Sequence, residues 1–231
     1  MSIAVKIDEQ SHFRKVIEND MMRERTLDNV RVEDFFSRMN LCDVLKPGMK
    51  VLELGCGNGK ILKGLADEYG IKPYGIDLAD FIGKQNISYR DPCFKKRVRF
   101  KVGNIQQVPY KDNRFDFVFS FMCFMYLTDK LKGLAECHRV MKPGASALID
   151  IKGDMVDSNT LIHPSLKQIV EKYPNENQIS LRGFFGSLDP VIDKYCRTVI
   201  INKTSSKPLV FPGLAAFDYE NDIRVNSFYE L

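Results

Sequence analysis

Several residue types and patterns are scarce in this chain of 231 residues. It has no tryptophan and three histidines, and its six cysteines include no pair at CxxC spacing. A structural zinc site needs closely spaced Cys or His ligands, so the sequence predicts no metal site. We expect the cysteines at positions 42, 56, 93, 123, 137 and 196 to be reduced thiols that pack as small apolar side chains. Reduced thiols are typical of a cytoplasmic protein.

Long apolar runs and a strong excess of charge are also lacking. No apolar run approaches the roughly 20 residues that cross a bilayer, so membrane insertion is not expected. Residues 1–15 include early acidic residues and no continuous apolar core, which is unlike a signal peptide. The 34 basic residues exceed the 30 acidic ones by too little to indicate nucleic acid as a partner. The basic cluster at 95–99 is expected to be a solvated turn. Nothing in this composition predicts an oligomeric state.

Short apolar segments alternate with helical patterns from residue 46 onward. We expect strands at 50–54, 73–76, 97–102, 114–121 and 145–151, and helices after residue 59, at 78–89 and at 129–140. This alternation predicts a parallel sheet with right-handed crossovers. A helix is expected at 164–172, and strands at 198–202 and 209–217 would close the sheet as an antiparallel hairpin. The predicted fold is α/β, a doubly wound, mostly parallel, seven-stranded sheet.

A glycine-rich turn follows the first expected strand. The segment ELGCGNG occupies residues 53–59, and its glycines permit a sharp turn and a close approach of backbone to a ligand. Asp77 ends the second strand, 22 residues after Gly55. Ligands of doubly wound folds bind at the carboxyl ends of the strands, where an acid can accept hydrogen bonds from ribose hydroxyls. Together these features predict a cofactor that contains a nucleoside.

The residues around this turn argue against two phosphate-binding motifs. A dinucleotide fingerprint requires glycine at position 60, where this chain has Lys60. A P-loop requires Ser or Thr after its Gly-Lys pair, and Ile61 stands there instead. An acid before the turn, Glu53, suits a cofactor with a cationic methionine end better than a pyrophosphate.

Four motifs in order carry a resemblance to a known family. The segments VLELGCGNG (51–59), GID (75–77), GNIQQVPYKDNRFDFVFS (103–120) and LAECHRVMKPGA (134–145) resemble those of class I S-adenosylmethionine-dependent methyltransferases. They are most similar to the small-molecule branch that includes ubiquinone and menaquinone biosynthesis methyltransferases. The resemblance spans roughly residues 48–151. It implies S-adenosylmethionine as the cofactor and methyl transfer to a nucleophilic atom of a small molecule.

The resemblance also implies a set of cofactor contacts. Glu53 and the backbone of Gly55 and Gly57 would hold the methionine amino and carboxylate groups, and Asp77 would hold the ribose. The adenine would lie beside Leu78, Asn104 and Ile105, with Phe121 under the cofactor. Asn104 departs from the aspartate that is more frequent in the family, but its carbonyl oxygen can still accept a hydrogen bond from the adenine amino group.

Candidate catalytic residues are fewer. Many relatives have a histidine after the fourth strand, and this chain has none in the stretch 122–127. Tyr126, in that stretch, is a candidate for acceptor contact or proton removal, although the stretch can also be a buried loop. His163 lies where substrate-facing loops are expected, but it also fits a packing or surface role. The segment RVMKPG (139–144) is interpreted as structural rather than catalytic.

The sequence divides into two expected parts and leaves two other functions open. Residues 1–45, helical and amphipathic over 9–45, are predicted to be a lid or cap, and residues 46–231 the methyltransferase catalytic domain. One alternative is a non-catalytic protein that binds S-adenosylmethionine. The other is a nicotinamide-dependent oxidoreductase, against which Lys60 and the downstream motifs argue. The identity of the acceptor, and whether O, N, C or S is methylated, stay undetermined.

Overall fold

The computed structural model describes 44–57, 59–78, 91–121, 123, 124, 127, 130–150, 179–182 and 198–209. The helices expected at 9–45, apart from Val44 and Leu45, and at 164–172 lie outside these residues. So do the helix expected at 78–89, apart from Leu78, and the strand expected at 209–217, apart from Leu209.

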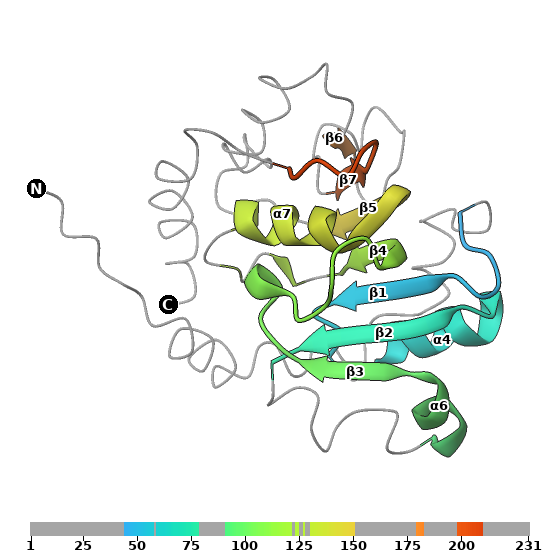
Figure 1. The fold of residues 1–231 in the computed structure, drawn as a ribbon. Helices are drawn as coiled ribbons and strands as arrows, with labels where there is room; N and C mark the ends of the chain where they lie inside the picture. The colour runs from blue at the N-terminus through green and yellow to red at the C-terminus, as the bar shows by residue number, and fades with distance from the viewer. Residues whose placement is uncertain are drawn as a thin grey trace, which may run out of the picture.

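The described strands form one seven-stranded sheet in the order β3-β2-β1-β4-β5-β7-β6 (Figure 1). Strands β1 to β5 are parallel to one another, and β7 is antiparallel to both β5 and β6. Their bounds are β1 Lys50–Leu54, β2 Lys72–Asp77, β3 Arg99–Val102, β4 Phe115–Ser120, β5 Met141–Asp150, β6 Ile179–Arg182 and β7 Thr198–Asn202. The predicted doubly wound sheet with an antiparallel edge is confirmed.

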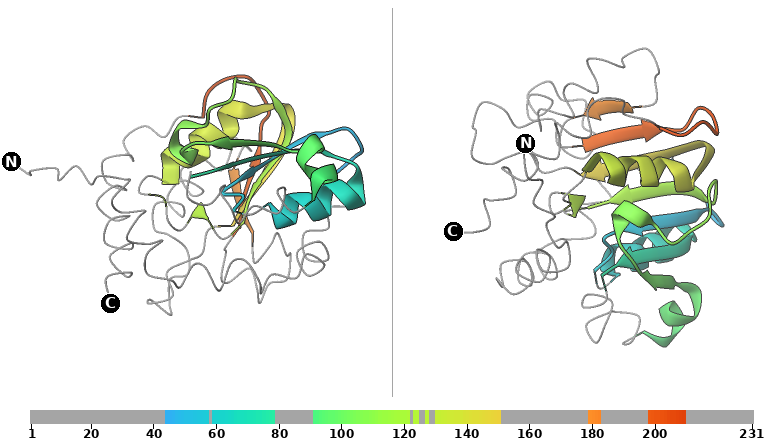
Figure 2. Two further views of the ribbon diagram at one scale, coloured as in Figure 1. Left: turned by 90° about the horizontal axis from the view of Figure 1, so that it is seen from below. Right: turned by 60° about the vertical axis from the view of Figure 1, so that its left-hand side comes forward.

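Helices cover both faces of the sheet, which explains why its central strands are mostly apolar and buried. Helix α4 (Lys60–Tyr69) and helix α7 (Lys130–Val140) lie on opposite faces (Figure 2). On the α4 face, Val51 packs with Leu62 and Leu65; on the α7 face, Leu52 and Leu54 pack with residues such as Leu134. Strand β1 is therefore buried from Val51 to Leu54, as expected of a central parallel strand. Among the described residues no helix has the length and apolar character needed to cross a membrane.

Three elements differ from the sequence-based expectations. Helix α6 (Pro92–Arg97) precedes β3, so the predicted strand at 97–102 begins two residues late. The side chain of Asp91 accepts hydrogen bonds from the backbone of Cys93 and Phe94, and Pro92 fits the first turn. The basic cluster therefore begins in the last turn of this helix rather than in a turn.

Strand β5 and the edge pair β6–β7 supply the other differences. The segment Lys142-Pro143-Gly144, expected to precede the strand, lies within β5 as an irregularity, because the pairing with β4 shifts register between Phe115 and Phe117. Gly144 adopts a φ of 81° there. Strand β7 pairs with β6, for which the sequence predicted no strand, and residues 210–217 lie outside the described part.

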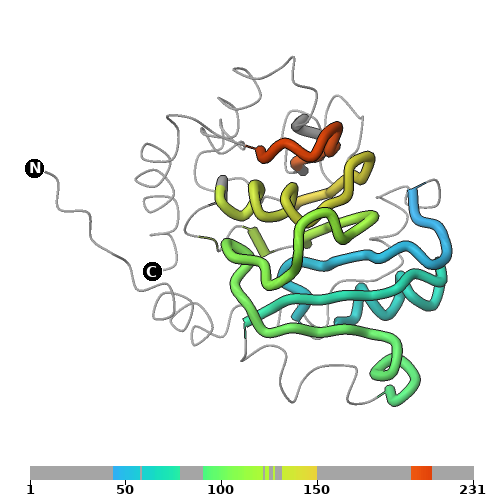
Figure 3. Tube along the Cα trace, in the orientation of Figure 1, coloured from blue at the N-terminus to red at the C-terminus, as the bar shows by residue number. Residues whose placement is uncertain are grey.

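The parallel strands bring the predicted site residues to one edge. Strands β1, β2 and β3 run in the same direction (Figure 1) and lie side by side in the chain trace (Figure 3). Leu54 is opposite Ile76, and Asp77 is opposite Val102 in the ladder. The glycine turn, Asp77 and the segment after β3 therefore meet at the carboxyl edge of the sheet.

Candidate functional site

The glycine turn after β1 is fixed to the neighbouring strand by its backbone. The N–H groups of Gly55 and Cys56 donate to the carbonyl oxygen of Ile76 at 2.9 and 3.1 Å, and the N–H of Gly59 donates to Cys56 at 2.8 Å. Gly55 has a φ of 78° and Gly57 a φ of 47°, values that residues with a side chain rarely adopt. The turn is thus held by hydrogen bonds that need no side chain.

Gly55 and Gly57 differ in how much space surrounds them. A Cβ atom at Gly55 would lie 2.2 Å from the Sγ atom of Cys123, so the thiol occupies the space that any side chain there would need. A Cβ atom at Gly57 would find no described atom within 4 Å. The site is therefore closely packed at Gly55 and open at Gly57, which leaves room for a ligand against the backbone at Gly57.

Glu53 is the most unusual residue of this edge. Its side chain is 3% exposed, and its Oε2 atom has no hydrogen-bond partner within the described structure. Burial raises the pKa of Glu53 well above its ordinary value, and the negative charge of Asp77 raises it further. A hydrogen bond from the backbone of Leu62, in the first turn of α4, lowers the pKa in part. The ionised form of Glu53 is therefore poorly compensated by the described residues.

Asp77 is the second acid of the site, and it is half-buried. Its Oδ2 accepts a hydrogen bond from the N–H of Gly57 at 2.6 Å, and its Oδ1 accepts one from the N–H of Leu78 at 2.7 Å. Burial raises the pKa of Asp77 to about 6, although both backbone hydrogen bonds favour the ionised form. Each carboxylate oxygen has a further lone pair, so Asp77 can accept two more hydrogen bonds from a ligand.

The remaining predicted cofactor residues lie around these two acids. Asn104 begins a short 3-10 helix, Ile105–Gln107, and its Oδ1 accepts a hydrogen bond from the N–H of Gln106 at 2.8 Å. Ile105 is buried, and its Cδ1 lies 3.8 Å from the Cβ position built at Gly55. Phe121 packs beside the apolar cluster of α4. The structure thus places Asn104 and Ile105 at the edge where the adenine was predicted, with Asn104 already bound locally.

The thiols of Cys56 and Cys123 were not predicted to belong to the site. Each has a pKa raised well above its ordinary value, mainly by burial and then by the charges of Asp77 and Glu53. They are therefore neutral at physiological pH. The glycine at position 55 was the one sequence signal of this contact. A residue without a side chain is needed there because Cys123 packs against the turn.

Both predicted catalytic residues, Tyr126 and His163, lie outside the described residues, as does the predicted lid over residues 1–45, apart from its last two residues. Their roles therefore stay predictions.

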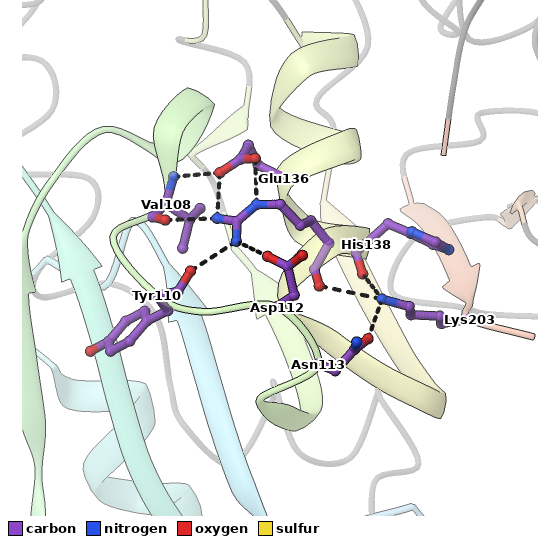
Figure 4. Close-up of polar contacts among 8 residues, drawn as sticks. Val108, Tyr110, Asp112, Asn113, Glu136, His138 and Lys203 are labelled. Carbon is purple, nitrogen blue, oxygen red and sulfur yellow. Dashed lines mark hydrogen bonds and ion pairs between the residues drawn. The ribbon is translucent and has the colours of Figure 1, made fainter. Parts of the chain in front are cut away.

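The RVMKPG segment lies at the opposite, amino edge of the parallel strands. All five N–H donors of Arg139 are used, and their acceptors are Val108 O, Tyr110 O, Asp112 Oδ1 and both carboxylate oxygens of Glu136 (Figure 4). These contacts tie the end of α7 to the loop before β4. The arrangement agrees with a structural role for Arg139, far along the sheet from the glycine turn.

Lys203 completes this amino-edge cluster. It is 3% exposed, and its Nζ donates to Asn113 Oδ1 at 2.8 Å and to the carbonyl oxygens of His138 and Arg139 at 2.9 and 3.3 Å (Figure 4). Three donors thus meet three acceptors, two of them at the carboxyl end of α7, where a positive charge is favourable. Through these hydrogen bonds Lys203, which follows β7, connects the strand pair β5–β7 to the end of α7.

Fold and site together define a class of protein. A doubly wound sheet with an open glycine turn, followed by an acid at the end of β2, is typical of a domain that binds a nucleoside cofactor. The buried, unpartnered oxygen of Glu53 adds a requirement for a proton donor or cation from the ligand. S-adenosylmethionine has a ribose for Asp77 and an ammonium group for Glu53, so the residues present fit this cofactor.

Comparison with known proteins shows which family the central part of the chain matches. The family described as "Methyltransferase domain" matches residues 52–149. Phosphoethanolamine N-methyltransferase 2 of Caenorhabditis elegans is 31% identical over 108 residues, which are 47% of this chain and 25% of that protein. Demethylmenaquinone methyltransferase of Bacillus mycoides is 34% identical over 116 residues, 48% of this chain and 47% of that protein. Residues 52–149 therefore match the methyltransferase domain family, and named methyltransferases are similar to this part of the chain.

A solved structure shares the fold. Haemonchus contortus phosphoethanolamine N-methyltransferase 2, in complex with phosphomonomethylethanolamine and S-adenosylhomocysteine, is similar with a TM-score of 0.50 and 21% identity. The similarity covers 71% of this chain and 35% of that one. The chain spans less than half the length of the two curated relatives named above.

Proposed function

We propose that this chain transfers a methyl group from S-adenosylmethionine to a nucleophilic atom of a small-molecule acceptor. The observation that carries the proposal is the pair of acids at the open glycine turn, within a segment that matches the methyltransferase domain family. The curated relatives that match this segment include enzymes named for phosphoethanolamine and demethylmenaquinone, which supports a small-molecule acceptor.

The residues of the chain would act mainly by binding and orienting. Asp77 would accept hydrogen bonds from the ribose, while Glu53 and the backbone of Gly57 would hold the amino acid end of the cofactor. Asn104, Ile105 and Leu78 would border the adenine. When bound, the cofactor supplies an activated methyl group on a sulfonium, so the protein needs to supply alignment and exclusion of water. Orientation alone can contribute about 7–11 kcal/mol to lowering a barrier.

Contact with the acceptor is proposed for the loops that follow β4 and β5. Tyr126 and His163 are the candidates, because parallel strands deliver the segments after their carboxyl ends to the ligand edge. Tyr126→Phe and His163→Ala variants that bind S-adenosylhomocysteine normally but lose turnover would identify the acceptor side of the site. Residues 1–45 are proposed as a lid, which predicts slower amide exchange over residues 10–40 when S-adenosylhomocysteine is bound.

The proposal is tested by binding and turnover measured on the same preparation. Calorimetry should detect S-adenosylmethionine and S-adenosylhomocysteine at micromolar concentrations and detect no NAD binding. Incubation of the protein with methyl-labelled S-adenosylmethionine and a metabolite extract should give a labelled product. Binding without any labelled product would favour a non-catalytic cofactor-binding protein, and binding of NAD instead would refute the methyltransferase proposal.

A further inference from the structure

The carboxyl edge contains an unequal pair of acids. Asp77 has two backbone N–H groups that compensate its negative charge. Glu53 has one compensating contact, the hydrogen bond from the backbone of Leu62, and its Oε2 atom is left without a partner among the described residues. Glu53 lies near the end of β1 and Asp77 ends the neighbouring strand β2, and the negative charge of Asp77 disfavours ionisation of Glu53.

The surroundings of Glu53 offer no positive side chain that acts on it within the described structure. On β2 the facing charge is Asp77, which is negative. In the turn after β1 and in the segment after β4 the titratable neighbours are the thiols of Cys56 and Cys123, which burial keeps neutral. From α4 the contact is a backbone N–H of Leu62. A buried carboxylate without a cation is costly, so this arrangement favours a neutral, protonated Glu53 in the empty site.

Glu53 belongs to the face of the sheet that α4 covers. Its neighbour two residues earlier, Val51, packs in the cluster with Leu62, and side chains alternate between faces along a strand. The carboxyl group therefore lies between the beginning of α4 and the glycine turn, where Gly57 leaves open space. A ligand that lies against this turn can bring a cation to the unpartnered oxygen.

We propose that Glu53 is an ion-exchange residue, which holds a proton in the empty site and releases it when the ammonium group of the cofactor binds. This inference rests on the proposed function. The charge balance is simple, because one proton leaves the Glu53 carboxyl group for the solvent and one ammonium group takes its place. The exchange selects nucleosides with a charged amino acid end over nucleosides that lack one. It also couples cofactor affinity to pH.

The coupling has a definite sign. Release of one proton per ligand strengthens binding as the pH rises, with a limit of about tenfold per pH unit while Glu53 is protonated in the empty protein. The effect depends on the ammonium group rather than on the ribose. S-adenosylhomocysteine, which retains the ammonium group, should show it, and 5′-methylthioadenosine, which has no amino acid end, should not.

Calorimetry in two buffers of different ionisation enthalpy, phosphate and Tris, tests the exchange at pH 7. The wild-type protein should release close to one proton per S-adenosylhomocysteine and none per 5′-methylthioadenosine. The Glu53→Gln variant should bind S-adenosylhomocysteine at least about tenfold more weakly and without proton release. Glu68→Gln, an exposed substitution on α4, is the matched control and should behave as wild type.

The outcomes separate the two proposals. Binding of S-adenosylhomocysteine by the wild type without proton release would overturn the exchange and leave the proposed function standing. Equal proton release by Glu53→Gln and wild type would do the same, because the proton would then come from another group. No binding at all would refute the proposed function and the exchange with it. Should Glu53→Gln fail to fold, Glu53→Asp retains the carboxyl group and should still release a proton with weaker binding.

Discussion

Charged side chains at the two edges of the parallel sheet differ in how completely they are hydrogen-bonded. At the amino edge, every donor of Arg139 and of the Lys203 ammonium group has an acceptor (Figure 4). At the carboxyl edge, Glu53 is as buried as Lys203, yet one of its oxygens has no partner within the described residues. The network of Arg139 and Lys203 is complete and stabilises the fold, whereas the unpartnered oxygen of Glu53 lies beside the open turn at Gly57, where a ligand can supply the missing contact. The comparison therefore assigns stability to one edge and cofactor binding to the other.

A large effect on stability is expected at the amino edge. Lys203→Met removes three hydrogen bonds and leaves buried acceptors at the end of α7 without their donor. We expect the free energy of unfolding to fall by about 2–4 kcal/mol, as measured by urea denaturation. The affinity for S-adenosylhomocysteine should change by less than about twofold, because the contacts of Lys203 lie at the other edge.

Lys207→Met is the control for this prediction, because Lys207 is exposed and should tolerate the change. A large loss of cofactor affinity in Lys203→Met, measured where the protein is fully folded, would show that the two edges are coupled and would break the comparison.

The second effect concerns Gly55, where the turn contacts Cys123. Gly55→Ala must accommodate both a left-handed backbone and a Cβ atom 2.2 Å from the Cys123 Sγ atom. Left-handed backbone costs an alanine roughly 1–2 kcal/mol, and the contact should add about 1–3 kcal/mol. Gly48→Ala is a matched control, because Gly48 has a φ of 82° and nothing within 4 Å of its Cβ position. Thermal unfolding of both variants isolates the cost of the contact.

The double variant Gly55→Ala with Cys123→Ala sharpens this test. Removal of the thiol should recover part of the lost stability, because the obstructing Sγ atom is gone. An equal loss in Gly55→Ala and Gly48→Ala would mean that Cys123 moves away freely and that the turn is less closely packed than the distances indicate.

The third effect is on cofactor affinity at Asp77. Asp77→Ala should weaken the binding of S-adenosylhomocysteine at least about tenfold, because charge-assisted hydrogen bonds contribute roughly 1.5–3 kcal/mol each. The same change removes the acceptors for the N–H groups of Gly57 and Leu78, so part of the loss comes from a looser turn. Calorimetry on folded protein measures the affinity. Asp77→Asn, which retains one carbonyl acceptor, should lose less, and unchanged affinity in Asp77→Ala would place the ribose elsewhere.

The fourth effect is a difference in how stability depends on pH. Because burial raises the pKa of Glu53 in the folded protein, the unfolded chain loses this proton first as the pH rises above the ordinary value of 4.5. The folded state is then disfavoured by up to about 1.4 kcal/mol per pH unit until the folded pKa is passed. Glu53→Gln removes this dependence, so its stability relative to wild type should increase from pH 5 to pH 7 in urea denaturation. Parallel pH profiles would show that Glu53 ionises freely in the folded protein.

Much of the central fold was predictable because its signals are local. Apolar strands, glycine turns and helices with one apolar face depend on residues close in sequence, so β1 matches its predicted bounds and α7 begins one residue late. The short helix α6 was missed because a run of basic residues obscured the cap at Asp91. Strand β6 was missed because an edge strand of four residues depends on pairing with β7 rather than on its own pattern.

The sequence by itself determined the order of the central elements, the glycine turn and the placement of Glu53 and Asp77 at strand ends, because these follow from short-range pattern. The tertiary structure alone decided which contacts each acid has. Residues 64 and more positions apart, such as Gly55 and Cys123 or Arg139 and Lys203, meet only when the sheet and α7 assemble. Such contacts decide whether a buried charged group has hydrogen-bond partners. The complete network at Arg139 and the unpartnered oxygen of Glu53 could therefore not be told apart from the sequence.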